Sequence, residues 1–180
     1  WMGHASGGLF KSTNHGTTWE AVFDEARSTS IADIAIAPSN PSIVYVGTGE
    51  QNNRQSSSWG HGVYKTEDGG KSWIHLGLEA TGHIGRIRVH PTDPDIVWVG
   101  AVGHLWGPNG ERGVYMSTDG GRTWEKTLFI SEDTGIVDLV ADHESPNILL
   151  AAAYQRRRTG FGLTFRRRFW ASSRDLFTAE

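Results

Sequence analysis

A short turn that ends in tryptophan recurs three times along the chain and sets a period of about fifty residues. The copies are KSTNHGTTW at 11–19, KTEDGGKSW at 65–73 and MSTDGGRTW at 116–124, so successive tryptophans are 54 and 51 residues apart. A fixed period of this length is typical of proteins built from repeated supersecondary units. The repeat therefore constrains the fold more than any single segment does.

Each repeat contains the same order of β-strand signals. One unit has IADIAIAP (31–38), which alternates up to a proline, and then IVYVGTGE (43–50), which is almost continuously apolar; the next has IGRIRVHP (84–91) and IVWVGAVG (96–103). Such runs, bounded by Gly, Pro, Asn and Asp, predict short antiparallel strands, and no long segment has a helical period. A repeated four-stranded meander predicts an all-β fold made of β-propeller blades.

We expect residues 1–162 to be an incomplete part of a propeller, because the units present are too few to close a ring of four to eight blades. The expected divisions are the end of one blade (1–23), two blades (24–78 and 79–130) and the start of another (131–162). The remaining blades would come from the parent chain.

The last segment, LTFRRRFWASSRDLFTAE (163–180), does not continue the repeat. We expect it to contain no third strand and to be poorly ordered. One hypothesis is a frameshift, because CGG arginine codons become glycine codons one nucleotide over. A basic segment for nucleic acid or a membrane is the alternative for this tail.

The repeated turn has the form Ser/Thr-x-Asp-x-Gly-x-x-Trp. Its members are Ser12, Asn14, Gly16 and Trp19, then Thr66, Asp68, Gly70 and Trp73, then Ser117, Asp119, Gly121 and Trp124. The hydroxyl and carboxylate can accept hydrogen bonds from turn N–H groups, and glycine tolerates positive φ. A calcium loop is the competing interpretation, but the required series of oxygen ligands is missing. We expect a structural role, since chemistry rarely needs three copies.

This turn resembles the Asp-box, or BNR repeat, of sialidase-like and sortilin-like propellers. The stretches 48–73, 83–124 and 148–162, with GLFKSTNHGTTWE near the start, resemble the bacterial VPS10/sortilin-N-terminal-like proteins, which are often labelled BNR-repeat glycosyl hydrolases. The resemblance implies a propeller of usually seven blades and a protein that is secreted, periplasmic or on the cell surface. It does not fix the function, because one fold serves many functions.

Catalytic motifs of the enzyme families with this repeat are not matched. The sialidase Arg-Ile-Pro motif and its Tyr/Glu pair are missing, and the strand ends Thr48–Glu50 and Ala101–Gly103 lack the aspartate of xyloglucanase-like propellers. Two functions remain open: a propeller that binds peptide or glycan, and a glycoside hydrolase whose catalytic carboxylates lie partly outside this fragment.

Composition and net charge further limit the classes of partner and chemistry that the chain can have. The net charge of −3 and pI near 6.2 give no reason to expect nucleic acid. The chain has no cysteine, which excludes thiolate chemistry. No window is apolar enough for a membrane span, and no motif indicates a cofactor.

In a meander with strands A to D, the repeated turns lie between C and D, so the B–C loops and D–A links share the opposite face. We expect a ligand there, with tryptophans for sugar faces or peptide side chains and planar polar groups for hydrogen bonds. The candidates are Glu50, Asn52, Asn53, Arg54, Trp59, His61, His83, Arg86, His104, Trp106, Gln155 and Arg156.

Two alternatives accompany this list. The same side chains could simply scaffold their loops, and His83 with His104 does not indicate a metal, so we expect none. Among acids, Glu50 alone ends a B strand on this face. Glu132 and Asp133 in a D–A link could complete a glycosidase pair, but their position is more typical of solvated turn residues.

Overall fold

A computed structural model of the chain describes residues 1–52, 56–159 and 162–172, with side chains as far as Arg156. This part of the chain forms four antiparallel sheets and contains no α-helix. The strands in chain order are β1 (Met2–His4), β2 (Gly8–Lys11) and β3 (Glu20–Ala21); β4 (Ile31–Ile36), β5 (Val44–Thr48), β6 (Val63–Thr66) and β7 (Ile74–His75); β8 (Ile84–Val89), β9 (Val97–Ala101), β10 (Gly113–Ser117) and β11 (Glu125–Leu128); and β12 (Thr134–Ala141), β13 (Leu149–Thr159) and β14 (Gly162–Ser172). A short 3-10 helix, η1 (Glu79–Thr81), precedes β8.

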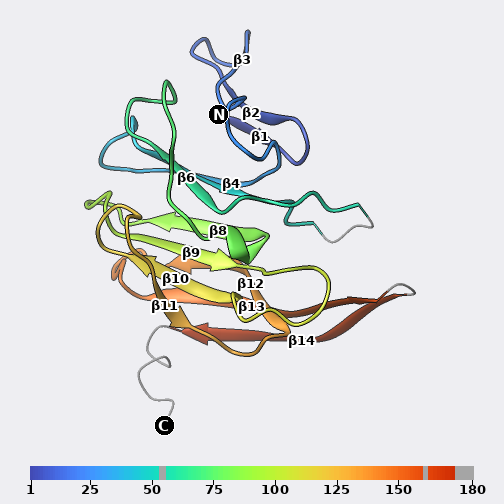
Figure 1. The fold of residues 1–180 in the computed structure, drawn as a ribbon. Helices are drawn as coiled ribbons and strands as arrows, with labels where there is room; N and C mark the ends of the chain where they lie inside the picture. Colours follow the sequence, from blue (N-terminus) through green and yellow to red (C-terminus); the bar gives the residue numbers. More distant parts are fainter. Residues whose placement is uncertain (53–55, 160–161, 173–180) are drawn as a thin grey trace.

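The sheets follow one another in chain order, each packed face to face on the next (Figure 1). The two complete sheets have the order β4-β5-β6-β7 and β8-β9-β10-β11, so each is a meander. The first strands of successive sheets lie next to one another: β8 packs against β4 on one side and against β12 of the fourth sheet on the other, so the first strands are innermost. The architecture is that of an incomplete β-propeller.

The core lies between the sheets and depends on glycine in each second strand. β5 and β9 are buried along their whole length, as their continuous apolar sequence predicts. A Cβ added at Gly47 would lie 2.5 Å from a side-chain carbon of Ile84, and one added at Gly100 would lie 2.8 Å from Ile136. Glycine at these positions lets an isoleucine of the next sheet pack directly on the backbone.

The repeated turns are closed by hydrogen bonds from their own residues. Thr66 Oγ1 accepts a hydrogen bond from the Gly70 N–H at 2.8 Å, and Asp68 Oδ1 accepts bonds from the Thr66 hydroxyl and the Ser72 N–H. The turns of Ser117–Asp119 and Ser12–Asn14 repeat this pattern. Both carboxylate oxygens of Asp68 and of Asp119 bond to their own turn, which fits the structural interpretation.

Hydrogen bonds also show which loops share a face. The turn after β6 bonds to the turn before β5, through the Gly69 N–H and the Ser42 carbonyl at 2.9 Å. On the opposite face, the loop after β5 bonds to the link before β8, through Gly60 N–H and the Gly82 carbonyl. The loops that follow β5 and β9 extend to the same side of the molecule, on the right of Figure 1. We call this side the loop face.

The expectation that the tail contains no third strand is wrong for residues 163–172. They belong to β14, which pairs with β13 from Thr159↔Gly162 to Leu150↔Ser172. The reason is the composition of LTFRRRFW, in which aromatic and β-branched residues favour an extended chain beside an unpaired strand edge. Residues 173–180 lie outside the described residues.

Candidate functional site

The loop face is centred on three aromatic rings from three different segments. Trp59 in the loop after β5 lies 4.9 Å from His104 in the loop after β9 and 5.7 Å from His83 before β8, measured between ring centroids. His104 is held in place because its Nε2–H donates to the Ala80 carbonyl at 2.9 Å. The Trp59 side of this group is open to solvent, since Trp59 is 53% exposed.

His83 is the buried member of this group. It is 0% exposed, and neither ring nitrogen has a hydrogen-bond partner among the described residues. Burial, and after it the charges of Arg156 and of His104, together lower the pKa of His83 to about 4. At neutral pH the ring is therefore uncharged and supports Trp59 by packing.

Two buried arginines donate hydrogen bonds to backbone carbonyls of the loops after β5 and β9. Arg112 donates to the His104 carbonyl at 2.6 Å and to the Asp133 carbonyl at 3.1 Å. Arg156 donates to the carbonyls of Gln51 and Asn52 at 3.3 and 3.5 Å. Both guanidinium groups are almost fully buried, and burial lowers the pKa of Arg112 to about 10. They act on loop backbone, which fixes the shape of the loop face.

Glu50 lies under the loop after β5 and faces away from solvent. It is 2% exposed, and its Oε2 accepts a hydrogen bond from the Ser58 N–H at 3.1 Å. Gln51 bonds to the Val137 carbonyl on β12 at 2.7 Å, so this loop also reaches across to the fourth sheet. The carboxylate of Glu50 thus stabilises its own loop through a hydrogen bond rather than facing a ligand.

Arg86 belongs to a chain of charges on the innermost strands. Its Nε donates to Asp138 on β12 at 2.7 Å and its Nη1 donates to Asp33 on β4 at 3.1 Å. Asp33 also accepts the Ile87 N–H at 2.7 Å. The three residues follow a bulge at the same place in β4, β8 and β12, so they connect three successive sheets.

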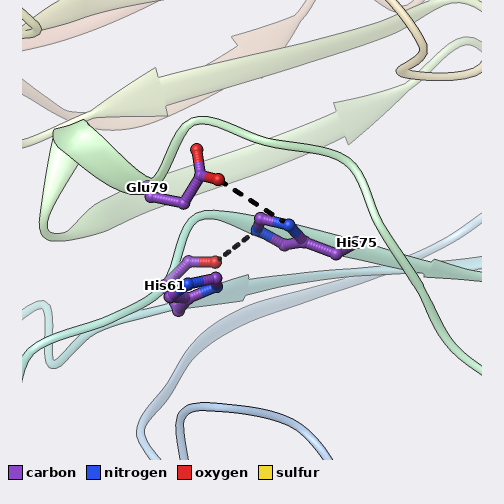
Figure 2. A group of neighbouring side chains, drawn as sticks. All are labelled: His61, His75 and Glu79. Carbon is purple, nitrogen blue, oxygen red and sulfur yellow. Dashed lines mark hydrogen bonds and ion pairs between the residues drawn. The ribbon is translucent and has the colours of Figure 1, made fainter.

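His61 lies apart from Trp59 and faces the outer strand of its sheet. The ring centroids of His61 and His75 on β7 are 4.5 Å apart. His75 Nδ1 lies 3.8 Å from a carboxylate oxygen of Glu79 in η1 (Figure 2). Burial lowers the pKa of His61, and the neighbouring His75 lowers it further.

The other predicted residues are distributed as follows. Trp106 is 48% exposed in the loop after β9, and Gln155 is half-buried on β13 opposite Thr134. Asn52 is exposed and contributes its carbonyl to Arg156. Asn53 and Arg54 lie outside the described residues. The structure therefore brings together Trp59, His83 and His104, while Arg86 and His61 belong to other groups.

Sequence reasoning missed Arg112, Gln51, His75 and Glu79. A buried arginine has no local signature, because Arg112 follows a Pro-Asn-Gly-Glu turn that reads as solvated loop. His75 and Glu79 are four positions apart across the end of a strand, and their approach to His61 depends on the pairing of β6 with β7.

Two cavities are lined by residues other than Trp59, His83 and His104. One of about 740 Å³ lies between the first two sheets and is lined by Lys11, Phe23 and Trp73 among others. Another of about 390 Å³ is lined by Glu25, Ala26, Arg27, His61, Tyr64, His75 and Glu79. No helix in the described residues is long and apolar enough to cross a membrane.

Repeated antiparallel sheets pack face to face in chain order, and buried arginines bond to the loops of one face. This arrangement defines an incomplete β-propeller. The sequence pattern of the Sortilin-Vps10 family ("Sortilin, neurotensin receptor 3") matches residues 7–128. Since this match covers more than half of the chain, the chain belongs to the Sortilin-Vps10 family. No curated protein matches the chain.

Solved structures with a similar fold include enzymes of family GH74. An ancestral GH74 enzyme matches with a TM-score of 0.67 at 19% identity, over 88% of this chain and 22% of that one. The GH74 xyloglucanase from Xanthomonas campestris matches with a TM-score of 0.52 at 11% identity, over 96% of this chain and 34% of its own. The GH74 enzyme from Niastella koreensis matches with a TM-score of 0.50 at 14% identity, over 94% and 34%. The chain thus spans about a third or less of these structures, and the likeness concerns the fold.

Proposed function

We propose that the loop face binds a glycan as part of an exported propeller. The observation that carries this proposal is the half-exposed Trp59, which is set on the rings of His83 and His104, with half-exposed Trp106 in the neighbouring loop. A rigid indole face is suited to the flat apolar face of a sugar ring. Arg112 and Arg156 pre-order the two loops, which lowers the entropic cost of binding.

The fold neighbours suggest the substrate class for the first test. One of them is a xyloglucanase, so β-linked glucan oligosaccharides and their xylosylated forms are the glycans to examine. A peptide is the alternative ligand, favoured by membership of the Sortilin-Vps10 family. Both ligands would use the same exposed tryptophans.

Glycoside hydrolysis is the second candidate, favoured by the GH74 neighbours. The burial of Glu50 argues against it as a surface acid, because its Oε2 is engaged by Ser58. Hydrolysis would therefore depend on carboxylates elsewhere in the parent protein. We accordingly place binding ahead of catalysis.

Isothermal titration of the chain with the oligosaccharide panel tests the proposal. Replacing Trp59 or Trp106 with alanine removes on the order of 50 Å² of apolar contact, about 1.3 kcal/mol, and should weaken binding about tenfold. Trp19→Ala is the matched control, since Trp19 is 43% exposed but belongs to the turn between β2 and β3 on the opposite face. Equal weakening by all three changes, or no heat from any glycan, contradicts the proposal.

A further inference from the structure

Two imidazoles and a carboxylate converge at the outer edge of the second sheet (Figure 2). His61 precedes β6, His75 lies on β7, and Glu79 begins η1. One potential ligand atom from each lies within 4.8 Å of the other two, and no second group of this kind occurs among the described residues. Ligands of one tetrahedral ion are about 3.4 Å apart, given metal–ligand bonds of about 2.1 Å. Binding an ion therefore requires the three side chains to move closer together, and the Glu79 side chain is 55% exposed.

The hydrogen bonds around the two histidines orient them as metal ligands. His75 Nε2–H donates to the His61 carbonyl at 2.9 Å, which leaves the Nδ1 lone pair directed toward Glu79. His61 Nδ1 lies 3.1 Å from the Tyr64 hydroxyl; in the tautomer with the proton on Nδ1, Tyr64 accepts that proton and the Nε2 lone pair is available for a metal. Metal-binding histidines characteristically donate their second ring N–H to a carbonyl or another oxygen in this way.

Donor chemistry and access select the ion. Imidazole nitrogens favour first-row transition metals over calcium and magnesium, and two histidines with one carboxylate are a familiar zinc set. The ligands line the cavity of about 390 Å³, so an ion can enter and keep an open coordination position. Glu25 in the same wall adds negative charge, which offsets the exposed Arg27.

We propose that His61, His75 and Glu79 bind one divalent transition-metal ion, with Zn²⁺ as the natural occupant. The ion links the start of β6 to the segment from β7 to η1. That segment leads into Gly82 and His83, on which Trp59 rests. Metal binding therefore stabilises the link that supports the loop face, independently of which ligand that face takes.

Titration of the tag-free chain with ZnCl₂, followed by calorimetry, and with CoCl₂, followed by visible absorption, tests this site. We expect one equivalent of either ion, a tetrahedral-type Co²⁺ spectrum, and no binding of Ca²⁺. Glu79→Gln and His75→Gln should each abolish the Co²⁺ spectrum and weaken Zn²⁺ binding by at least about 100-fold. Tyr64→Phe, which keeps all three ligands, should weaken it about tenfold.

The matched controls are His143→Ala and Glu144→Gln, which change an exposed histidine and glutamate in the turn between β12 and β13. Both should bind Zn²⁺ as the wild type does. Glu79 is 55% exposed, so its variant should stay folded, with unchanged metal-free Tm. Absence of stoichiometric binding, or unchanged binding in Glu79→Gln, overturns the proposal.

Discussion

The indole Nε1–H of Trp124 donates a hydrogen bond of 2.7 Å to the carbonyl of Leu76, which directly follows the last strand of the preceding sheet. Trp73 makes the same bond, at 2.6 Å, to the carbonyl of Val22 after the first sheet. Trp73 and Trp124 thus each fasten their own sheet to the one before it. Trp19 in the first turn has no preceding sheet in the described residues and is 43% exposed.

Trp124→Phe should destabilise the chain, because it leaves the Leu76 carbonyl without its donor and reduces the packed ring. We expect a loss of about 1–3 kcal/mol in the free energy of unfolding. Trp19→Phe, the matched change in the exposed copy, should cost less than about 0.5 kcal/mol. Urea unfolding measures both, and comparable losses would contradict a fastening role for Trp124.

The carboxylates of the repeated turns should stabilise the fold only while they are charged. Hydrogen bonds from Ser72 to Asp68 and from Thr123 to Asp119 hold the pKa of each carboxyl well below its ordinary value of 3.8. The unfolded chain then binds more protons in acid, so stability is full above the ordinary carboxyl pKa and falls as the pH drops through and below it.

Asp68→Asn with Asp119→Asn tests this dependence, since Asn14 makes the equivalent bonds in the first turn. The double variant should fold with the same turns and should lose less stability than the wild type between about pH 5 and pH 2. Urea midpoints measured across this range check it. Parallel curves for the two proteins would show that the turn carboxylates carry no acid sensitivity.

His83 should add a separate pH dependence at milder acidity. Its pKa is about 4 in the folded chain against 6.5 when unperturbed, so between these values the unfolded chain binds the extra proton. Stability should therefore fall by up to roughly 3 kcal/mol as pH drops from 6.5 to 4, and then level off for this group. His83→Leu should flatten that interval, whereas the exposed His143→Ala should leave it unchanged. An unaltered slope in His83→Leu would contradict the assignment.

Arg86 should be a major link between the inner strands. Arg86→Met leaves Asp33, which is 12% exposed, and Asp138 without their shared cation. Removing one partner of a fully buried pair costs about 3–5 kcal/mol, and partial exposure here reduces the expected loss to roughly 1–3 kcal/mol. Adding Asp33→Asn should recover part of it in a double-mutant cycle. Purely additive effects would show that the pair is not coupled.

The repeat and the sheets could be predicted because their signals are local. Turn residues such as Gly70 and Asp68 act within a few positions, and the continuous apolar runs of β5 and β9 indicate burial on both faces. The division between the two faces followed from the meander alone. Trp59, His83 and His104 were placed on one face for the same reason.

The features that could not be predicted from the sequence depend on contacts between segments that are far apart in the chain. Arg86 was expected near a ligand, but its partners Asp33 and Asp138 come from neighbouring sheets and are more than fifty residues away. Glu50 was expected to contact a ligand on the loop face, and only the fold of its loop shows that it is buried. The strand β14 was missed because its sequence departs from the repeat, although pairing with β13 needs only an extended chain.

The most direct test of ligand binding at the loop face is the NMR spectrum of the indole N–H groups, recorded during titration with a xylosylated glucan oligosaccharide. The chain has eight tryptophans, of which Trp59 and Trp106 are half-exposed on the loop face. The signals of Trp59 and Trp106 should shift together and saturably. Those of Trp73 and Trp124, which bond between sheets, and of Trp19 on the opposite face should stay in place. Shifts confined to Trp19, Trp73 or Trp124, or no shift with any glycan, would contradict a glycan-binding loop face.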